Sequence, residues 1–232
     1  MQKHNSDFNL ALQLCNKDLS HDDLINFLKS GNVIERQYAG LTINEIKNTE
    51  EAEIILSNLT GVDGKIRETI ALKLTELTKQ YSELFLNNSD CYKIFANATI
   101  DIDGNVCRLA IESAKNLSAS KTFSENYTQE MFNIINTALE EISKFTFRDK
   151  KYKINKQIFK IYWCLEALSY FYKYAEINLV INLLEKCANL SEYTIKEKCA
   201  KILVVIGRNS YTETLFNKLQ NDENYYVRKI FE

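Results

Sequence analysis

The residues best suited to chemistry in this sequence are the cations gathered in the segment 144–160. That segment holds seven Lys or Arg residues and one Asp, whereas the whole chain has a net charge of −2. Such a cluster attracts nucleic-acid phosphates, because bound Lys and Arg release condensed counterions, and it equally attracts an acidic protein surface. A solvated connection between two helices has the same composition, since Lys is mostly exposed in folded proteins. The candidate partner-binding residues, which include two cations of other predicted helices, are Arg108, Lys150, Lys151, Lys153, Lys156, Lys160 and Lys201.

A catalytic set is not evident elsewhere in the sequence. Both histidines, His4 and His21, lie near the N-terminus, so a Ser/His/Asp or Cys/His arrangement is hard to assemble. The six cysteines form no Cys-x-x-Cys pair, which favours small buried side chains over zinc ligands. The segment Asp101–Asn105 is similar to a fragment of a calcium loop but lacks the bidentate Glu of such loops. We expect no enzymatic activity, no cofactor and no metal.

The composition indicates an all-α protein. The chain has 232 residues, 45% of them hydrophobic, with six Gly and no Pro. All-β folds need many tight turns, which Gly and Pro usually supply, so this composition argues against them. The longest aliphatic run, residues 202–206, is far shorter than the roughly 20 residues that cross a bilayer. The first residues also lack the apolar stretch of a secretory signal, so we expect a cytoplasmic protein without a membrane partner.

An internal repeat predicts the helices that must position these cations. Residues 63–77, 103–117 and 192–206 align without gaps and carry apolar or small residues at relative positions 0, 4, 5, 8 and 11. That spacing forms one stripe along an α-helix. Weaker copies are Ile34, Tyr38 and Ala39; Ile154, Ile158, Phe159, Tyr162 and Leu165; and a last copy that begins at Val227. The copies recur about every 40 residues, which is typical of stacked helix pairs.

Each stripe follows a shorter amphipathic helix, so we predict helical repeats within one domain, residues 1–232. Their approximate ranges are 20–48, 49–87, 89–118, 128–175, 176–208 and 211–232. Short helices are marginal in water when alone, and stacking buries the apolar stripe of each pair against the next pair. The stretch from Ser118 to Tyr127 is the longest one without a recognised helical pattern, and we expect a mobile loop there.

The repeat resembles the HEAT family, within the wider class of armadillo-like superhelices. The matching residues are Asp63-Gly-Lys-Ile66-Arg67 and Asn224-Tyr-Tyr-Val227-Arg228. The resemblance implies an all-α fold, a right-handed α-α superhelix of about five helix pairs plus a partial sixth. It also implies ladders, which are rows of contacts between Asp and Arg side chains of neighbouring repeats. Arg67, Lys196 and Arg228 occupy one equivalent position of these ladders, and Asp63 and Asp103 occupy another.

The resemblance further implies a concave surface lined by the second helix of each pair. The outward positions there are Glu68, Arg108, Glu112, Lys156, Lys160, Glu197, Lys201 and Lys229. We therefore expect a non-catalytic protein-interaction module or scaffold whose partner is another protein. The alternative is a nucleic-acid-binding protein that uses segment 144–160 and is similar to HEAT-like DNA glycosylases, although the only tryptophan, Trp163, is expected in the core. A third interpretation makes the chain a part of a larger repeat array.

Overall fold

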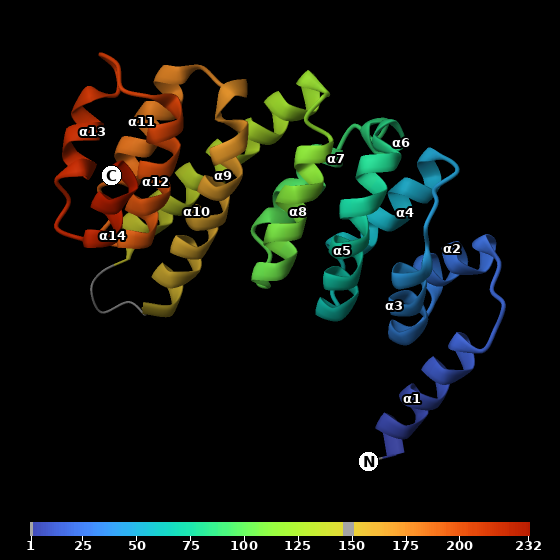
Figure 1. Cartoon of the computed structure of the whole chain (residues 1–232). Coiled ribbons are helices and arrows are strands. Elements are labelled where there is room, and N and C mark those ends of the chain that lie inside the picture. Colours follow the sequence, from blue (N-terminus) through green and yellow to red (C-terminus); the bar gives the residue numbers. More distant parts are fainter. Residues whose placement is uncertain (1, 146–150) are drawn as a thin grey trace. The chain divides into compact units, whose positions relative to one another are not determined.

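The computed structural model describes residues 2–145 and 151–232, with side chains from Asp7 onward. The chain divides into two compact units, Met1–Phe123 and Ser124–Glu232. Every regular element of the described residues is an α-helix or a short 3-10 helix (Figure 1). The all-α prediction is therefore confirmed, whereas the prediction of a single domain stays a prediction. In the described part of the chain, no helix has both the length and the apolar character needed to cross a bilayer.

Unit 1 is a stack of helix pairs. Its helices are α1 (Gln2–Cys15), α2 (His21–Ser30), α3 (Val33–Thr42), α4 (Thr49–Leu59), α5 (Gly64–Gln80), α6 (Ser82–Leu86), α7 (Cys91–Thr99) and α8 (Gly104–Asn116). The first helices of the pairs, α2, α4 and α7, pack in one row, and the second helices, α3, α5 and α8, pack in another. Helix α1 packs on α3 at the start of the second row. This two-row stack is the arrangement that the repeat predicts.

The second helices of unit 1 begin where a short polar side chain caps the backbone. The carboxylate of Asp63 accepts hydrogen bonds from the amides of Lys65 and Ile66 at 2.9 and 3.1 Å, and Asp103 accepts one from the amide of Asn105 at 2.8 Å. These caps satisfy amides that have no partner inside the first helical turn. The prediction that Asp63 and Asp103 take part in inter-repeat ladders is therefore wrong, because both carboxylates cap their own helix.

The ladder between these repeats uses the acidic residue two places before the cap. Arg67 donates to the carboxylate of Asp101 through Nε at 2.6 Å and through Nη2 at 3.2 Å. Its Nη1 also donates to the carbonyl oxygens of Gly61 and Val62, both at 3.0 Å. Both side chains of the ion pair are mostly buried, so this planar bidentate contact ties α5 to the turn that precedes α8.

The predicted stripe forms the core of unit 1. Its buried members on α5 and α8 are Ile66, Ile70, Ala71, Leu74, Leu77, Val106, Ala110, Ile111, Ala114 and Leu117. On α3 the register is one residue later than predicted, since Ala39 and Ile43 are buried and Ile34 is partly exposed. The position of the cap explains the shift. Asn32 caps α3 as Asp63 caps α5, and the buried residues of the two helices lie at the same distances along the chain from their caps.

Unit 2 repeats the arrangement, and its first two helices, α9 and α10, are longer than any helix of unit 1. Its elements are α9 (Lys121–Lys144, which begins just before the unit), α10 (Lys151–Phe171), η1 (Tyr172–Tyr174), α11 (Ile177–Cys187), α12 (Tyr193–Ile206), α13 (Glu213–Gln220), α14 (Tyr225–Arg228) and η2 (Lys229–Phe231). The second helices α10, α12 and α14 pack in that order, and α11 and α13 pack on α12. The ladder also recurs, because Lys196 donates to the carboxylate of Asp222 at 2.8 Å.

The loop expected between Ser118 and Tyr127 is wrong, because α9 begins at Lys121. Phe123, Tyr127 and Met131 are all buried, and they recur every fourth residue as on one face of a helix. The ring centroid of Tyr127 lies 4.9 Å from that of Phe171 on α10. Polar residues between these aromatic positions hid the helical period from sequence analysis.

The stripe predicted on α10 is displaced toward the end of the helix. Of its five residues only Leu165 is buried, and Ile158, Phe159 and Tyr162 are half-buried. The buried side chains of α10 are Ile161, Cys164, Leu165, Ala167, Leu168 and Phe171. The first half of α10 therefore leaves an aromatic face that the core does not use.

Candidate binding surface

The structure places most of the predicted partner-binding cations in unit 2. Lys151, Lys153 and Lys156 are exposed in the first turns of α10, and Lys160 is half-buried one turn later. Lys201 is exposed on α12, and Arg108 is exposed on α8, in unit 1. Lys150 lies outside the described residues. The described lysines of α10 thus form one group at the start of that helix.

Part of this basic group is directed toward α9. Lys144 donates to Glu141 at 2.8 Å, and this hydrogen bond, with the nearby charges of Lys153 and Lys160, lowers the pKa of the Glu141 carboxyl. The ammonium of Lys153 also lies 5.5 Å from the ring centroid of Phe145. Lys153 and Lys160 are seven residues apart and share one helix face. These two lysines therefore serve the packing of α9 and α10 in part.

The three lysines of α12 are engaged in ion pairs. Lys201 pairs with Glu197 at 2.6 Å on the same helix, and Lys198 reaches across to Glu166 on α10. Burial disfavours the charge of Lys198, but the hydrogen bond to Glu166, the charge of Glu166 and the contact with Tyr162 together outweigh it, so the pKa of Lys198 is raised. Lys196 forms the ladder described above. The second helices of unit 2 thus carry less available positive charge than the sequence suggests.

The most distinct feature of this face is a cavity of about 360 Å³ between α10 and the start of α12, here called the α10 cavity. Its lining residues are Asn155, Ile158, Phe159, Tyr162, Glu192 and Thr194. The four from α10 follow the spacing i, i+3, i+4, i+7, which places them on one face of the helix. The repeat pattern assigned three of them to the core, and the structure corrects that assignment: they line an open cavity.

Trp163 supports the cavity from beside its aromatic lining. Its ring lies edge-on to Phe159 at 6.2 Å and to Tyr162 at 5.4 Å between centroids. The side chain is only partly buried, and its buried Nε1 has no hydrogen-bond acceptor among the described residues. The ammonium of Lys198 lies 4.5 Å from the Tyr162 ring, a cation–π distance that holds this ring in place.

Exposed tyrosines continue this face at the starts of the second helices, and we call Tyr152, Tyr193, Tyr225 and Tyr226 the tyrosine edge. Tyr152 is 74% exposed and Tyr226 is 61% exposed. The Tyr193 and Tyr226 rings lie 6.0 Å apart, which places the starts of α12 and α14 side by side. The sequence offered one signal that was missed, namely a tyrosine directly after the cap positions Glu192 and Asn224.

Comparison with known proteins identifies no family. No family model matches the chain, and no curated protein matches it. Among solved structures, the chain is similar to an engineered protein, a Northeast Structural Genomics Consortium target, with 13% identity, a TM-score of 0.47, and coverage of 90% of this chain and 92% of that one. It is also similar to a designed armadillo repeat protein, with 11% identity, a TM-score of 0.43, and coverage of 89% and 94%.

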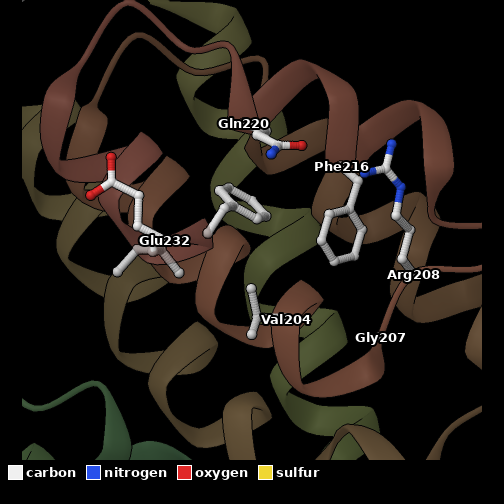
Figure 2. A pocket seen from close by; sticks show the side chains of 8 residues that line it. Val204, Gly207, Arg208, Phe216, Gln220 and Glu232 are labelled. Atoms are coloured by element: carbon white, nitrogen blue, oxygen red, sulfur yellow. The ribbon is translucent and has the colours of Figure 1, made fainter.

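A second cavity of about 430 Å³ lies at the other end of α12 (Figure 2). Val204, Phe216 and Phe231 give it an apolar lining. Its only cation, Arg208, stands beside Phe216 and is held by Glu213 at 2.6 and 2.7 Å. The guanidinium is therefore committed within the protein, and the other polar side chains of the lining are those of Gln220 and Glu232.

Most described side chains suited to metal binding or nucleophilic chemistry are paired with a carboxylate or buried. No cluster of His, Cys, Asp and Glu in the described residues is arranged to hold a metal ion. His21 lies 2.9 Å from Glu51 through Nε2 and 3.7 Å from Glu45 through Nδ1. Five of the six cysteines are buried, as expected, and Cys15 is exposed. Burial raises the pKa of the Cys91 and Cys107 thiols to about 12, so these thiols stay protonated at neutral pH.

Proposed function

We propose that the protein is a non-catalytic interaction module of the HEAT-like repeat class and that it binds a partner protein along the second helices of unit 2. The observation that carries this proposal is the α10 cavity, an aromatic hollow on a helix face that the core leaves uncovered. We also propose a cytoplasmic location, since six free cysteines suit a reducing compartment.

The chemistry of the surface supports a protein partner. Tyr and Trp are enriched among the residues that contribute most to protein–protein binding, because each gives a large contact area for little loss of side-chain freedom. The aromatic residues of the cavity lining come from one helix, α10, and Trp163 and Lys198 contact their rings. A partner side chain therefore meets a pocket that is already formed, which lowers the entropic cost of binding.

A peptide-display selection on the full chain tests this proposal. Random peptides of about 12 residues are selected against the wild-type protein, and enriched clones are then measured against Phe159→Ala, which removes one aromatic ring from the lining of the α10 cavity. Tyr211→Ala is the matched control, because Tyr211 is an exposed aromatic residue of unit 2 outside the cavity lining.

We expect clones that bind the wild type and the Tyr211→Ala control equally and that lose about tenfold in affinity for Phe159→Ala. Far-UV circular dichroism checks that both variants remain helical. A selection that enriches no clone, or only clones indifferent to Phe159→Ala, contradicts binding at this face.

A further inference from the structure

The available positive charge near the α10 cavity is concentrated at one end of it. Lys151 and Lys156 are exposed, and no ion pair is formed by either within the described residues. Lys151 lies on the same helix stripe as Asn155 and Tyr162, so it extends the line of the cavity residues toward the start of α10. Lys156 lies beside Asn155 and one turn before Phe159. Two cations thus lie on α10 within about one helical turn of residues that line the aromatic hollow.

The cavity itself is apolar on one wall and polar on the other. Ile158, Phe159 and Tyr162 form the apolar wall from α10. The Glu192 carboxylate and the Thr194 hydroxyl, at the start of α12, offer hydrogen-bond acceptors on the other wall, and the Asn155 amide oxygen offers one at the end of the α10 wall. Its volume is near the lower end of the range of about 300–1,000 Å³ for ligand pockets, which suits one bulky side chain. An aromatic side chain with an N–H or O–H donor satisfies both walls.

We infer that this surface binds a short acidic peptide segment with one aromatic anchor: the anchor enters the α10 cavity, and acidic residues beside it contact Lys151 and Lys156. This inference rests on the proposed function and names the class of partner. The tyrosine edge extends the contact beyond the cavity, with Tyr193 next to the lining residue Thr194 on α12.

The distribution of charge favours a peptide over a nucleic acid. A polynucleotide carries regularly spaced phosphates, and proteins that bind it track the backbone with cations along a groove. Here the cations do not continue from α10 to α12, because Lys196, Lys198 and Lys201 are neutralised by acidic partners. Glu192 adds a negative charge to the cavity itself. A local patch of positive charge beside a hollow matches a few carboxylates and one anchor.

Fluorescence anisotropy with the full chain tests the inference. The probes are labelled peptides of about 12 residues: an Asp/Glu-rich peptide with a central Trp, the same peptide with Ala in place of Trp, and a Lys-rich peptide with the central Trp. A labelled oligo(dT) of about 12 nucleotides is the nucleic-acid probe. We expect the acidic Trp peptide to bind at least about tenfold more tightly than each of the other three.

Two variants locate the binding. Lys151→Ala combined with Lys156→Ala, called the α10 lysine variant, is expected to weaken binding of the acidic Trp peptide about fivefold. Phe159→Ala is expected to weaken its binding about tenfold. The matched control is Lys65→Ala combined with Lys79→Ala, which removes two exposed lysines of unit 1 and is expected to leave affinity unchanged. The effect of the α10 lysines shrinks as salt is raised, because salt screens exposed charges.

The alternative outcomes separate this inference from the proposed function. If the Lys-rich peptide binds more tightly than the acidic Trp peptide and Phe159→Ala abolishes this binding, the partner is not acidic. That outcome overturns the inference but supports the proposed binding surface. The inference is overturned if the acidic Trp peptide does not bind at up to millimolar concentration. It is also overturned if the α10 lysine variant binds this peptide as tightly as the wild type does. In both cases the display selection then decides the proposed function. Tighter binding of oligo(dT) that is lost in the α10 lysine variant overturns both.

Discussion

Lysines of unit 2 have different roles because their neighbours differ. Lys196 is mostly buried and donates to Asp222, so it holds α12 against the turn before α14. Lys198 bridges to α10 and also lies over the Tyr162 ring, so it supports the cavity wall. Lys151 and Lys156 project into solvent. Sequence analysis assigned Lys196 to the ladder, but it grouped Lys151, Lys156 and Lys201 as candidate partner-binding cations, and the structure separates Lys201 from the other two because it pairs with Glu197.

Cysteine reactivity tests the burial of single residues. We expect one of the six thiols, that of Cys15, to react rapidly with an aromatic disulfide reagent in the native protein, because the other five are buried. Burial also raises the pKa of Cys91 and Cys107, which keeps the nucleophilic thiolate scarce. Absorbance of the released thiolate counts the reactive groups. Cys15→Ser should abolish the fast phase, and a second fast thiol would contradict the burial described here.

At the scale of elements, the turns of unit 1 distinguish a cap from a ladder. Asp103 caps α8, whereas Asp101 pairs with Arg67 of α5 and also accepts the Asp103 amide at 2.8 Å. We expect Asp103→Ala to lower the free energy of unfolding by about 1 kcal/mol, the usual cost of losing a cap. Asp101→Ala should cost about 2–3 kcal/mol, because it leaves a mostly buried guanidinium without its carboxylate.

Urea unfolding followed by circular dichroism measures both changes. Arg67→Ala with Asp101→Ala provides the double-mutant cycle, in which the second substitution should cost less than it does alone. Equal losses for the two aspartates would mean that the ladder contributes no more than the cap.

The hydrophobic period predicted the positions of the helices better than it predicted which of their residues are buried. On α5 the stripe from Ile66 to Leu77 is wholly buried, because cap and apolar period agree there. On α10 the same period runs through Ile158 and Tyr162, which line a cavity. A helical spacing fixes which residues share a face, but burial depends on the neighbouring helix, here the start of α12. The sequence signal could not carry that tertiary information.

Across the molecule, the apolar side chains left exposed differ between the units. On the second helices of unit 1 the large exposed residues are aliphatic, as at Leu41 and Leu72. On those of unit 2 four exposed aromatic residues form the tyrosine edge, while Tyr170 of α10 and Val204 and Val205 of α12 are exposed near the other ends of their helices. The apolar stripes that hold each stack together are buried and do not include these exposed residues. The buried faces of these helices stabilise each stack, and under the proposed function the exposed faces contact the partner.

This separation gives a prediction for the tyrosine edge as a whole. Tyr152→Ala, Tyr225→Ala and Tyr226→Ala combined should leave the melting temperature within about 2 °C of the wild type, because exposed side chains contribute little to stability. The same variant should bind display-selected peptides about tenfold more weakly, since aromatic contacts dominate such interfaces. Differential scanning calorimetry and anisotropy measure the two quantities on one sample. Val62→Ala with Ile102→Ala, which removes exposed aliphatic residues of unit 1, is the control and should change neither. A large fall in melting temperature would show that these tyrosines are part of the packed structure, and unchanged affinity would exclude them from the contact surface.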